Sequence, residues 1–295
     1  MGLFIMAIVG TNENIYLGIT NLIPYTMKKT FFLLLILVVT VNLQAQVYWL
    51  NDLESAKSVA SESNKLIVMD FWASWCGPCN LMDQKLWQSS EIVPYSKNFV
   101  GVKIDFDNNH TLAIAYNTQA IPKVVLATAS GDVIWENVGF SGADSYLTIL
   151  KAVPVNVGEL NKYAVAYESA KKDPMANYNY GLAFQTIGKD IANDNLKRSF
   201  LKCCENYLSK AQKLSKDEGF NSEIDLYTIL NDVYNGKPEK ALKKLDKQGA
   251  RPGNNNYEDI RHFVLAKCYK GTKDQENFEK EKKQISKKEL LAQLD

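Results

Sequence analysis

The hydrophobic pattern divides the chain into a first part, in which strands and helices alternate, and a second part that is helical throughout. Short continuous apolar runs in the first part are typical of strands buried on both faces. They predict strands at residues 65–71, 99–105, 123–128 and 132–139. The segments between and around them predict helices at residues 51–63, 76–87, 111–117 and 142–153. This order predicts an α/β fold over residues 46–154, with a mixed sheet flanked by helices.

After Pro154 only helical periodicity remains. Apolar residues recur at steps of three and four, which is one face of a helix; they are Ala176, Tyr180, Ala183, Phe184 and Ile187, and then Leu196, Phe200, Cys203, Cys204, Tyr207, Ala211 and Leu214. We expect turns centred on Gly188, Gly236 and Gly271; the last two are 35 residues apart, close to the tetratricopeptide period of about 34. The first interval, 48 residues, breaks this regularity. Residues 155–295 are therefore predicted to form an all-α domain of helical hairpins that resembles tetratricopeptide repeats only weakly.

The N-terminal segment has the features of a secretory signal. Two lysines follow Met27, an apolar run comes next, and the segment ends at Ala45. We therefore expect Met27 to be the true start, residues 1–26 to come from an over-extended gene model, and cleavage to follow Ala45. The mature protein is then periplasmic or secreted. The alternative is an uncleaved membrane anchor, although the run is shorter than the roughly 20 apolar residues of a membrane span.

The overall charge excludes one class of partner. The 295-residue chain has 34 basic and 33 acidic side chains, a formal net charge of +1. This balance provides no electrostatic basis for binding nucleic acid. We expect no nucleic-acid partner.

Cys76 and Cys79 flank a Gly-Pro pair directly after the first predicted strand. A structural zinc site usually needs a second ligand pair, but the only histidines, His110 and His262, are far apart and no second such cysteine pair exists. A disulfide between residues three apart closes a very small loop and stabilises a fold weakly. We expect neither a metal nor another cofactor, and a redox pair explains the spacing better than a structural disulfide does.

The local sequence supports redox chemistry. If a helix begins just after Cys76, its free backbone N–H groups and its dipole favour the thiolate of that residue. The thiolate is the attacking species, so Cys76 is expected to be the nucleophile. Pro78 suits the first helical turn. Cys79, one turn further on, is expected to be more buried and to resolve the mixed disulfide formed on Cys76.

The segment VMDFWASWCGPC, residues 68–79, resembles the active-site segment of thioredoxins, and the resemblance extends over about residues 47–153. It implies a redox disulfide between Cys76 and Cys79 across Gly77 and Pro78. It also implies that Asp70 is a buried acid that relays protons to Cys79. Trp72 and Trp75 match the aromatic residues beside the motif. Ile121 and Pro122 match the loop that contains a cis-proline and guides the substrate.

Two positions depart from the thioredoxin pattern. Asn80 stands where thioredoxins typically have a lysine, and Gly101 lies near where they place the lysine that neighbours the buried acid. Both departures leave the tuning of Asp70 and Cys79 open. The continuation over residues 81–109 is more similar to the exported thioredoxin-like branch that includes the C-terminal domain of DsbD.

The resemblance therefore implies an exported thiol–disulfide oxidoreductase that works as a disulfide reductase or isomerase. Its expected partners are proteins with disulfides, a membrane electron-transfer protein of the DsbD type, and a possible protein partner of the helical domain. The alternative is an adaptor in which the helical domain binds a partner and the thioredoxin-like domain is a regulatory or binding module. For the other cysteines, burial in the core and a disulfide from Cys268 to Cys203 or Cys204 both stay open.

Overall fold

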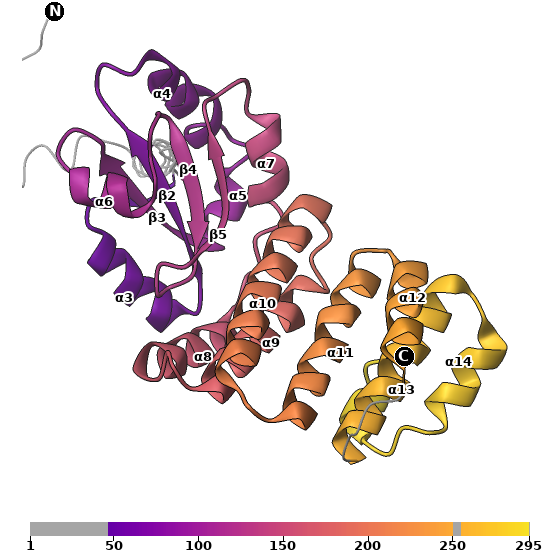
Figure 1. The fold of residues 1–295 in the computed structure, drawn as a ribbon. Coiled ribbons are helices and arrows are strands. Elements are labelled where there is room, and N and C mark those ends of the chain that lie inside the picture. The colour runs from indigo at the N-terminus through magenta and orange to yellow at the C-terminus, as the bar shows by residue number, and fades with distance from the viewer. Residues whose placement is uncertain (1–46, 250–254, 295) are drawn as a thin grey trace, which may run out of the picture. The chain divides into compact units, whose positions relative to one another are not determined.

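The computed structural model describes residues 47–249 and 255–294 (Figure 1). The predicted signal segment and the cleavage site after Ala45 lie outside the described residues. Within the described ranges, none of the helices combines the length and the apolar character needed to cross a membrane.

A five-stranded mixed sheet forms the first part, as the sequence predicts. Its order is β1-β3-β2-β4-β5; β1, β3 and β2 run parallel, and β4 and β5 are antiparallel to their neighbours. The central strand β2 is buried on both faces, which explains its continuous apolar sequence. The short edge strand β1 was not predicted. The strands are β1 (Trp49–Leu50), β2 (Leu66–Trp72), β3 (Phe99–Asp105), β4 (Lys123–Ala127) and β5 (Val133–Val138).

Helices cover both faces of this sheet. One hydrophobic cluster joins α3 to Ile67, Met69 and Phe71 of β2, with residues of α6 packed against it. The opposite face, with Leu66 and Val68, packs against α4, η1 and α7. The predicted helix at residues 76–87 is α-helical only in its first half and π-helical in its second, and α5 was not predicted. The helices are α3 (Leu53–Ser63), α4 (Gly77–Met82), the π-helix η1 (Asp83–Trp87), α5 (Val93–Ser96), α6 (His110–Ala115) and α7 (Asp144–Leu150).

The second part is helical, as predicted. Both predicted apolar faces are present, on α9 and α10, and most of their residues are buried, whereas Leu214 is exposed. Gly236 lies in the loop before α12 with a φ of 71°, but Gly271 lies inside the last turn of α13, so the expected third turn begins later, at Lys273. The helices are α8 (Gly158–Ser169), α9 (Pro174–Gly188), α10 (Asp194–Leu214), α11 (Glu218–Tyr234), α12 (Pro238–Gln248), α13 (Asn255–Thr272), α14 (Gln275–Lys282) and α15 (Lys288–Leu291).

Residues of the sheet and of the helical part belong to one hydrophobic cluster. Leu126 and Ile134 of the hairpin are in the same cluster as Phe184 and Phe200 of α9 and α10. The Tyr180 hydroxyl also donates a hydrogen bond of 2.8 Å to the Asp132 carboxylate in the hairpin loop. The division at residues 154 and 155 stays a prediction, and the shared cluster is a reason to use the full chain in experiments.

The three cysteines of the helical part are free thiols in the structure. Cys204 and Cys268 are buried and Cys203 is half-buried. Burial raises the pKa of each thiol to about 12. The structure therefore agrees with core packing, and the alternative disulfide from Cys268 is not formed.

Candidate active site

The two motif cysteines lie at the start of α4, where the sequence predicts them. Cys76 is the N-cap residue, and its Sγ accepts a hydrogen bond of 3.1 Å from the backbone N–H of Cys79. Pro78 occupies the first turn of the helix, where its missing N–H group is not needed. A disulfide joins the cysteines, with their Cα atoms 5.2 Å apart. The sulfur of Cys76 is therefore placed at the positive end of the helix.

The predicted difference in burial between the cysteines is absent from this disulfide form. Cys76 is 3% exposed and Cys79 is 2% exposed. Both pack with Ala73, and half-buried Trp72 and Ile121 contact this small cluster. Because the bond holds both sulfurs in the same cluster, any greater accessibility of Cys76 has to arise in the reduced form.

The loop before β4 brings Ile121 to the disulfide. The Ile121–Pro122 peptide bond is cis, as the resemblance implies. Pro122 is buried and its carbonyl oxygen accepts a hydrogen bond of 2.7 Å from the N–H of Gly139. The contact of Ile121 with the cluster of Cys76 and Cys79 agrees with the guiding position that the resemblance implies.

Asp70 lies near the end of β2 and is 1% exposed. Its Oδ2 accepts a hydrogen bond of 3.1 Å from the indole N–H of Trp87, whereas its Oδ1 is buried without a hydrogen-bond partner. Burial raises the pKa of Asp70 from 3.8 to about 7, against the opposing effect of Lys103. The carboxyl group can therefore take up and release a proton near neutral pH.

The sequence interpretation took the lysine beside this acid to be absent, but the structure contains one. Lys103, two positions after Gly101, pairs with Asp70 in the parallel register, so both side chains are on one face of the sheet. Its Nζ lies 3.6 Å from Asp70 Oδ2. Gly101 has a packing role instead: a Cβ there would lie 2.9 Å from the carbonyl oxygen of Tyr48. The register between β2 and β3, which local sequence does not reveal, brings Lys103 to Asp70.

A second carboxylate shares the lysine, and the sequence interpretation missed it. Asp83 Oδ1 accepts a hydrogen bond from the Lys103 ammonium, and the negative charge of Asp83 contributes to the raised pKa of Asp70. Asp83 and Trp87 are the first and last residues of η1, so one short π-helix supplies both contacts to the acid and its lysine. The spacing of Asp83, four residues after Cys79, is one helical turn and was the available signal.

The two predicted tryptophans differ in exposure. Trp72 is half-buried, and the Lys103 ammonium lies 5.1 Å from its ring centroid. Trp75 is 67% exposed, and its indole N–H donates a hydrogen bond of 2.8 Å to Asp107.

Asn80 is exposed, and its side-chain amide donates a hydrogen bond of 3.4 Å to the carbonyl oxygen of Ser74. A neutral amide therefore occupies the position at which thioredoxins typically have a lysine.

In the described ranges, no cluster of three or more His, Cys, Asp or Glu side chains has the arrangement of a metal site.

The order of the sheet and the Cys-Gly-Pro-Cys disulfide at a helix N-terminus define a thioredoxin-like oxidoreductase fold. Residues 48–129 match the family model described as thioredoxin-like. Thioredoxin of Pyropia yezoensis is 30% identical over 111 residues, which are 37% of this chain and 90% of that protein. The chain belongs to the thioredoxin-like family.

Further relatives show how far the similarity extends. Mitochondrial thioredoxin of Mus musculus is 36% identical over 85 residues, 29% of this chain and 49% of that protein. The chain thus spans about half the length of this relative. Among solved structures, one titled DsbH oxidoreductase has 23% sequence identity, covers 38% of this chain and 88% of its own, and has a TM-score of 0.34.

Proposed function

We propose that the protein is a thiol–disulfide oxidoreductase that reduces or isomerises disulfides in other proteins. The observation that carries this proposal is the placement of Cys76 as the N-cap of α4, in a disulfide with Cys79. After reduction, the N–H group of Cys79 and the helix dipole favour the thiolate of Cys76. The raised pKa of Asp70, about 7, supports its proposed role in moving the proton of Cys79.

The proposed reaction has two exchanges. The Cys76 thiolate attacks one sulfur of a substrate disulfide, so a mixed disulfide forms and the other substrate sulfur leaves as a thiolate. Cys79 gives its proton to Asp70 and then attacks Cys76 Sγ. The Cys76–Cys79 bond forms and the second substrate thiolate leaves. The protein dithiol is oxidised and the substrate disulfide gains two electrons.

Insulin reduction tests the activity. The full chain, supplied with dithiothreitol, is expected to accelerate the precipitation of reduced insulin, and Cys76→Ser is expected to lose this acceleration. The full chain is required because the sheet and the helices share a hydrophobic cluster. Equal rates with and without the wild-type protein would instead favour the adaptor function.

We also propose that the protein is exported and receives its electrons from a membrane electron-transfer protein of the DsbD type. The secretory features of residues 27–45 support export. Outside the cytosol thiols are not kept reduced by glutathione or thioredoxin, so a reductase there needs its own electron supply. N-terminal sequencing of the protein from the periplasmic fraction is expected to begin at Gln46; a chain that retains residues 1–26 would contradict this.

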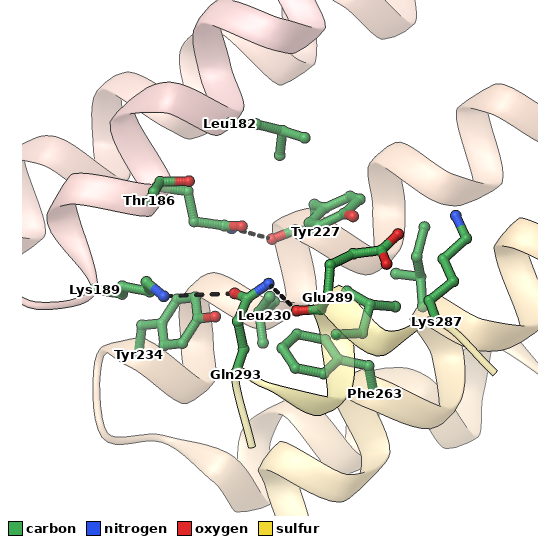
Figure 2. A pocket seen from close by; sticks show the side chains of 13 residues that line it. Leu182, Thr186, Lys189, Tyr227, Leu230, Tyr234, Phe263, Lys287, Glu289 and Gln293 are labelled. Carbon is green, nitrogen blue, oxygen red and sulfur yellow. Dashed lines mark hydrogen bonds between the residues drawn. The ribbon is translucent and has the colours of Figure 1, made fainter. Parts of the chain in front are cut away.

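A cleft in the helical part favours the second candidate function, the binding of a partner protein (Figure 2). It is a cavity of about 240 Å³ that is lined by both apolar and hydrogen-bonding side chains. This combination is typical of binding pockets in general, and here we take the ligand to be a side chain of the partner protein. Its lining comes from α9, α11, α13 and the segment around α15; the apolar members are Leu182, Leu230, Ile260, Phe263 and Leu290, and the others include Lys189, Tyr227, Tyr234, Lys287, Glu289 and Gln293.

The two functions can be separated by filling this cleft. In a Cys79→Ser background, which retains mixed disulfides, Leu182→Trp is expected to reduce the amount of trapped substrate if the cleft recruits substrates. Insulin turnover by Leu182→Trp with both cysteines intact should equal that of the wild type. Unchanged trapping would mean that the cleft does not recruit substrates for the cysteines.

A further inference from the structure

Lys123, the residue directly after Pro122, is a buried cation. Its side chain is only 2% exposed, and its ammonium contacts three oxygen atoms. These are the carbonyl oxygen of Tyr116 at 2.6 Å, the carbonyl oxygen of Asn117 at 3.4 Å, and Oε2 of Glu136 at 2.9 Å. A buried ammonium is unfavourable unless it is paired and its three donors find acceptors, and here they do.

The acceptors come from elements on both sides of the loop that contains Pro122. Tyr116 is the C-cap residue of α6. Carbonyl groups at the end of a helix have no N–H partner within it, and a positive charge there is favourable. Glu136 lies on β5 opposite Val125, so it is the diagonal neighbour of Lys123 on one face of the sheet. The ammonium thus links the end of α6 to β4 and β5.

The loop between these contacts is the one that reaches the disulfide. Residues 118–122 connect the two anchored ends, and Ile121 packs against the cluster of Cys76 and Cys79. The Lys123 ammonium holds the two ends of this loop together, so the ends cannot separate unless its contacts break. Glu136 is half exposed and gives the ammonium its one carboxylate, while both carbonyl groups belong to the loop's first anchor.

We propose that Lys123 is a positioning residue that fixes the loop of residues 118–122 beside Cys76 and thereby sets how a protein substrate meets the nucleophile. This inference rests on the proposed oxidoreductase function. It assigns the carbonyl contacts of Lys123 the positioning role and the Glu136 contact a minor one. Small thiol reagents, which do not need the loop, should not depend on Lys123.

The test compares three variants of the full chain. Lys123→Met keeps the apolar stem and removes the ammonium; Lys123→Arg keeps a charged donor; Glu136→Gln is the matched control that removes only the exposed partner. Lys123→Met is expected to raise KM for insulin by at least about tenfold at similar kcat, since the loop contacts the substrate chain equally in the ground state and the transition state. Lys123→Arg and Glu136→Gln should stay within about twofold of the wild type.

Two further measurements distinguish loop positioning from a general loss of structure. Alkylation of reduced Cys76 by iodoacetamide should proceed at the wild-type rate in Lys123→Met. Backbone amide exchange at residues 119–121 should accelerate by about tenfold in Lys123→Met, because the anchored loop opens more often, but not in Glu136→Gln. An unchanged KM, or equal effects of Lys123→Met and Glu136→Gln, would overturn the inference.

The exchange measurement also separates this inference from the proposed function. If the wild type does not reduce insulin but Lys123→Met still accelerates amide exchange in the loop, the proposed function fails and the anchoring by Lys123 stands. If insulin is reduced and neither KM nor exchange changes, the function stands and the positioning role is wrong.

Discussion

Replacement of Asp70 by asparagine should stabilise the protein, and by more at high pH than at low pH. The folded state keeps the Asp70 proton up to a pH of about 7, whereas an ordinary aspartate releases it near 3.8. Between these values the folded protein binds more protons than the unfolded chain. The free energy of unfolding of the wild type therefore falls as the pH rises through this window and levels off above it.

The size of the effect follows from the two pKa values. A shift of about 3 units corresponds to about 4 kcal/mol of destabilisation once Asp70 is ionised in both states. Most of this change lies within an accessible range: between pH 5 and pH 8 the Asp70 contribution changes by about 2 to 3 kcal/mol. Asparagine carries no charge and can still accept from the Trp87 indole. The stability advantage of Asp70→Asn should therefore grow by about 2 to 3 kcal/mol over that range.

Urea denaturation followed by tryptophan fluorescence measures this directly. All 5 tryptophans lie between residues 49 and 135, so the signal reports on the part of the chain that contains Asp70. The oxidised wild type and Asp70→Asn are compared at pH 5 and pH 8, with Asp246→Asn as a control at an exposed aspartate. A stability difference that is the same at both pH values would refute the proposed burial effect.

Three further outcomes are expected. Cys79→Ser should accumulate mixed disulfides with substrate proteins while Cys76→Ser forms none; adducts on Cys79 in the latter would reverse the assigned roles. Equilibration with glutathione buffers should give a reduction potential in the reducing half of the range from about −270 to about −120 mV, and a value above about −160 mV would make the protein an oxidant. Asp83→Asn should lower the pKa of Asp70 below 7, since it removes a negative charge and frees Lys103 to pair with Asp70. This pKa can be measured by ¹³C NMR titration of the Asp70 carboxyl group, and the same pKa in the wild type and in Asp83→Asn would contradict the prediction.

Local signals were sufficient for most elements of the fold. The run at residues 99–105 is apolar because its strand is covered on both faces, and its predicted bounds equal those of β3. The edge strand β1 has only two residues, too short for any periodicity, and pairing with β3 alone makes it a strand. The π-helical geometry of η1 likewise leaves no periodic signature, because its residues continue the pattern of α4.

The sequence by itself determined where the two cysteines of the site lie. A Cys-Gly-Pro-Cys motif that follows a buried strand and opens a helix fixes both sulfur positions through local geometry alone, because only two residues separate the cysteines and one helical turn brings them together. Asp70 was identified through the resemblance to thioredoxins, and its burial in the structure agrees with what that resemblance implies.

Only the tertiary structure decided what surrounds those residues. Lys103 reaches Asp70 through the register of two parallel strands that are 33 positions apart in the chain, and Lys123 reaches the carbonyl of Tyr116 across a loop. Neither contact follows from the identity of neighbouring residues, because register and loop closure depend on the packing of the whole sheet. The physical reason is the distance along the chain over which each interaction acts. Helical hydrogen bonds and helix caps join residues a few positions apart, whereas the burial and charge that tune Asp70 come from side chains that folding brings together.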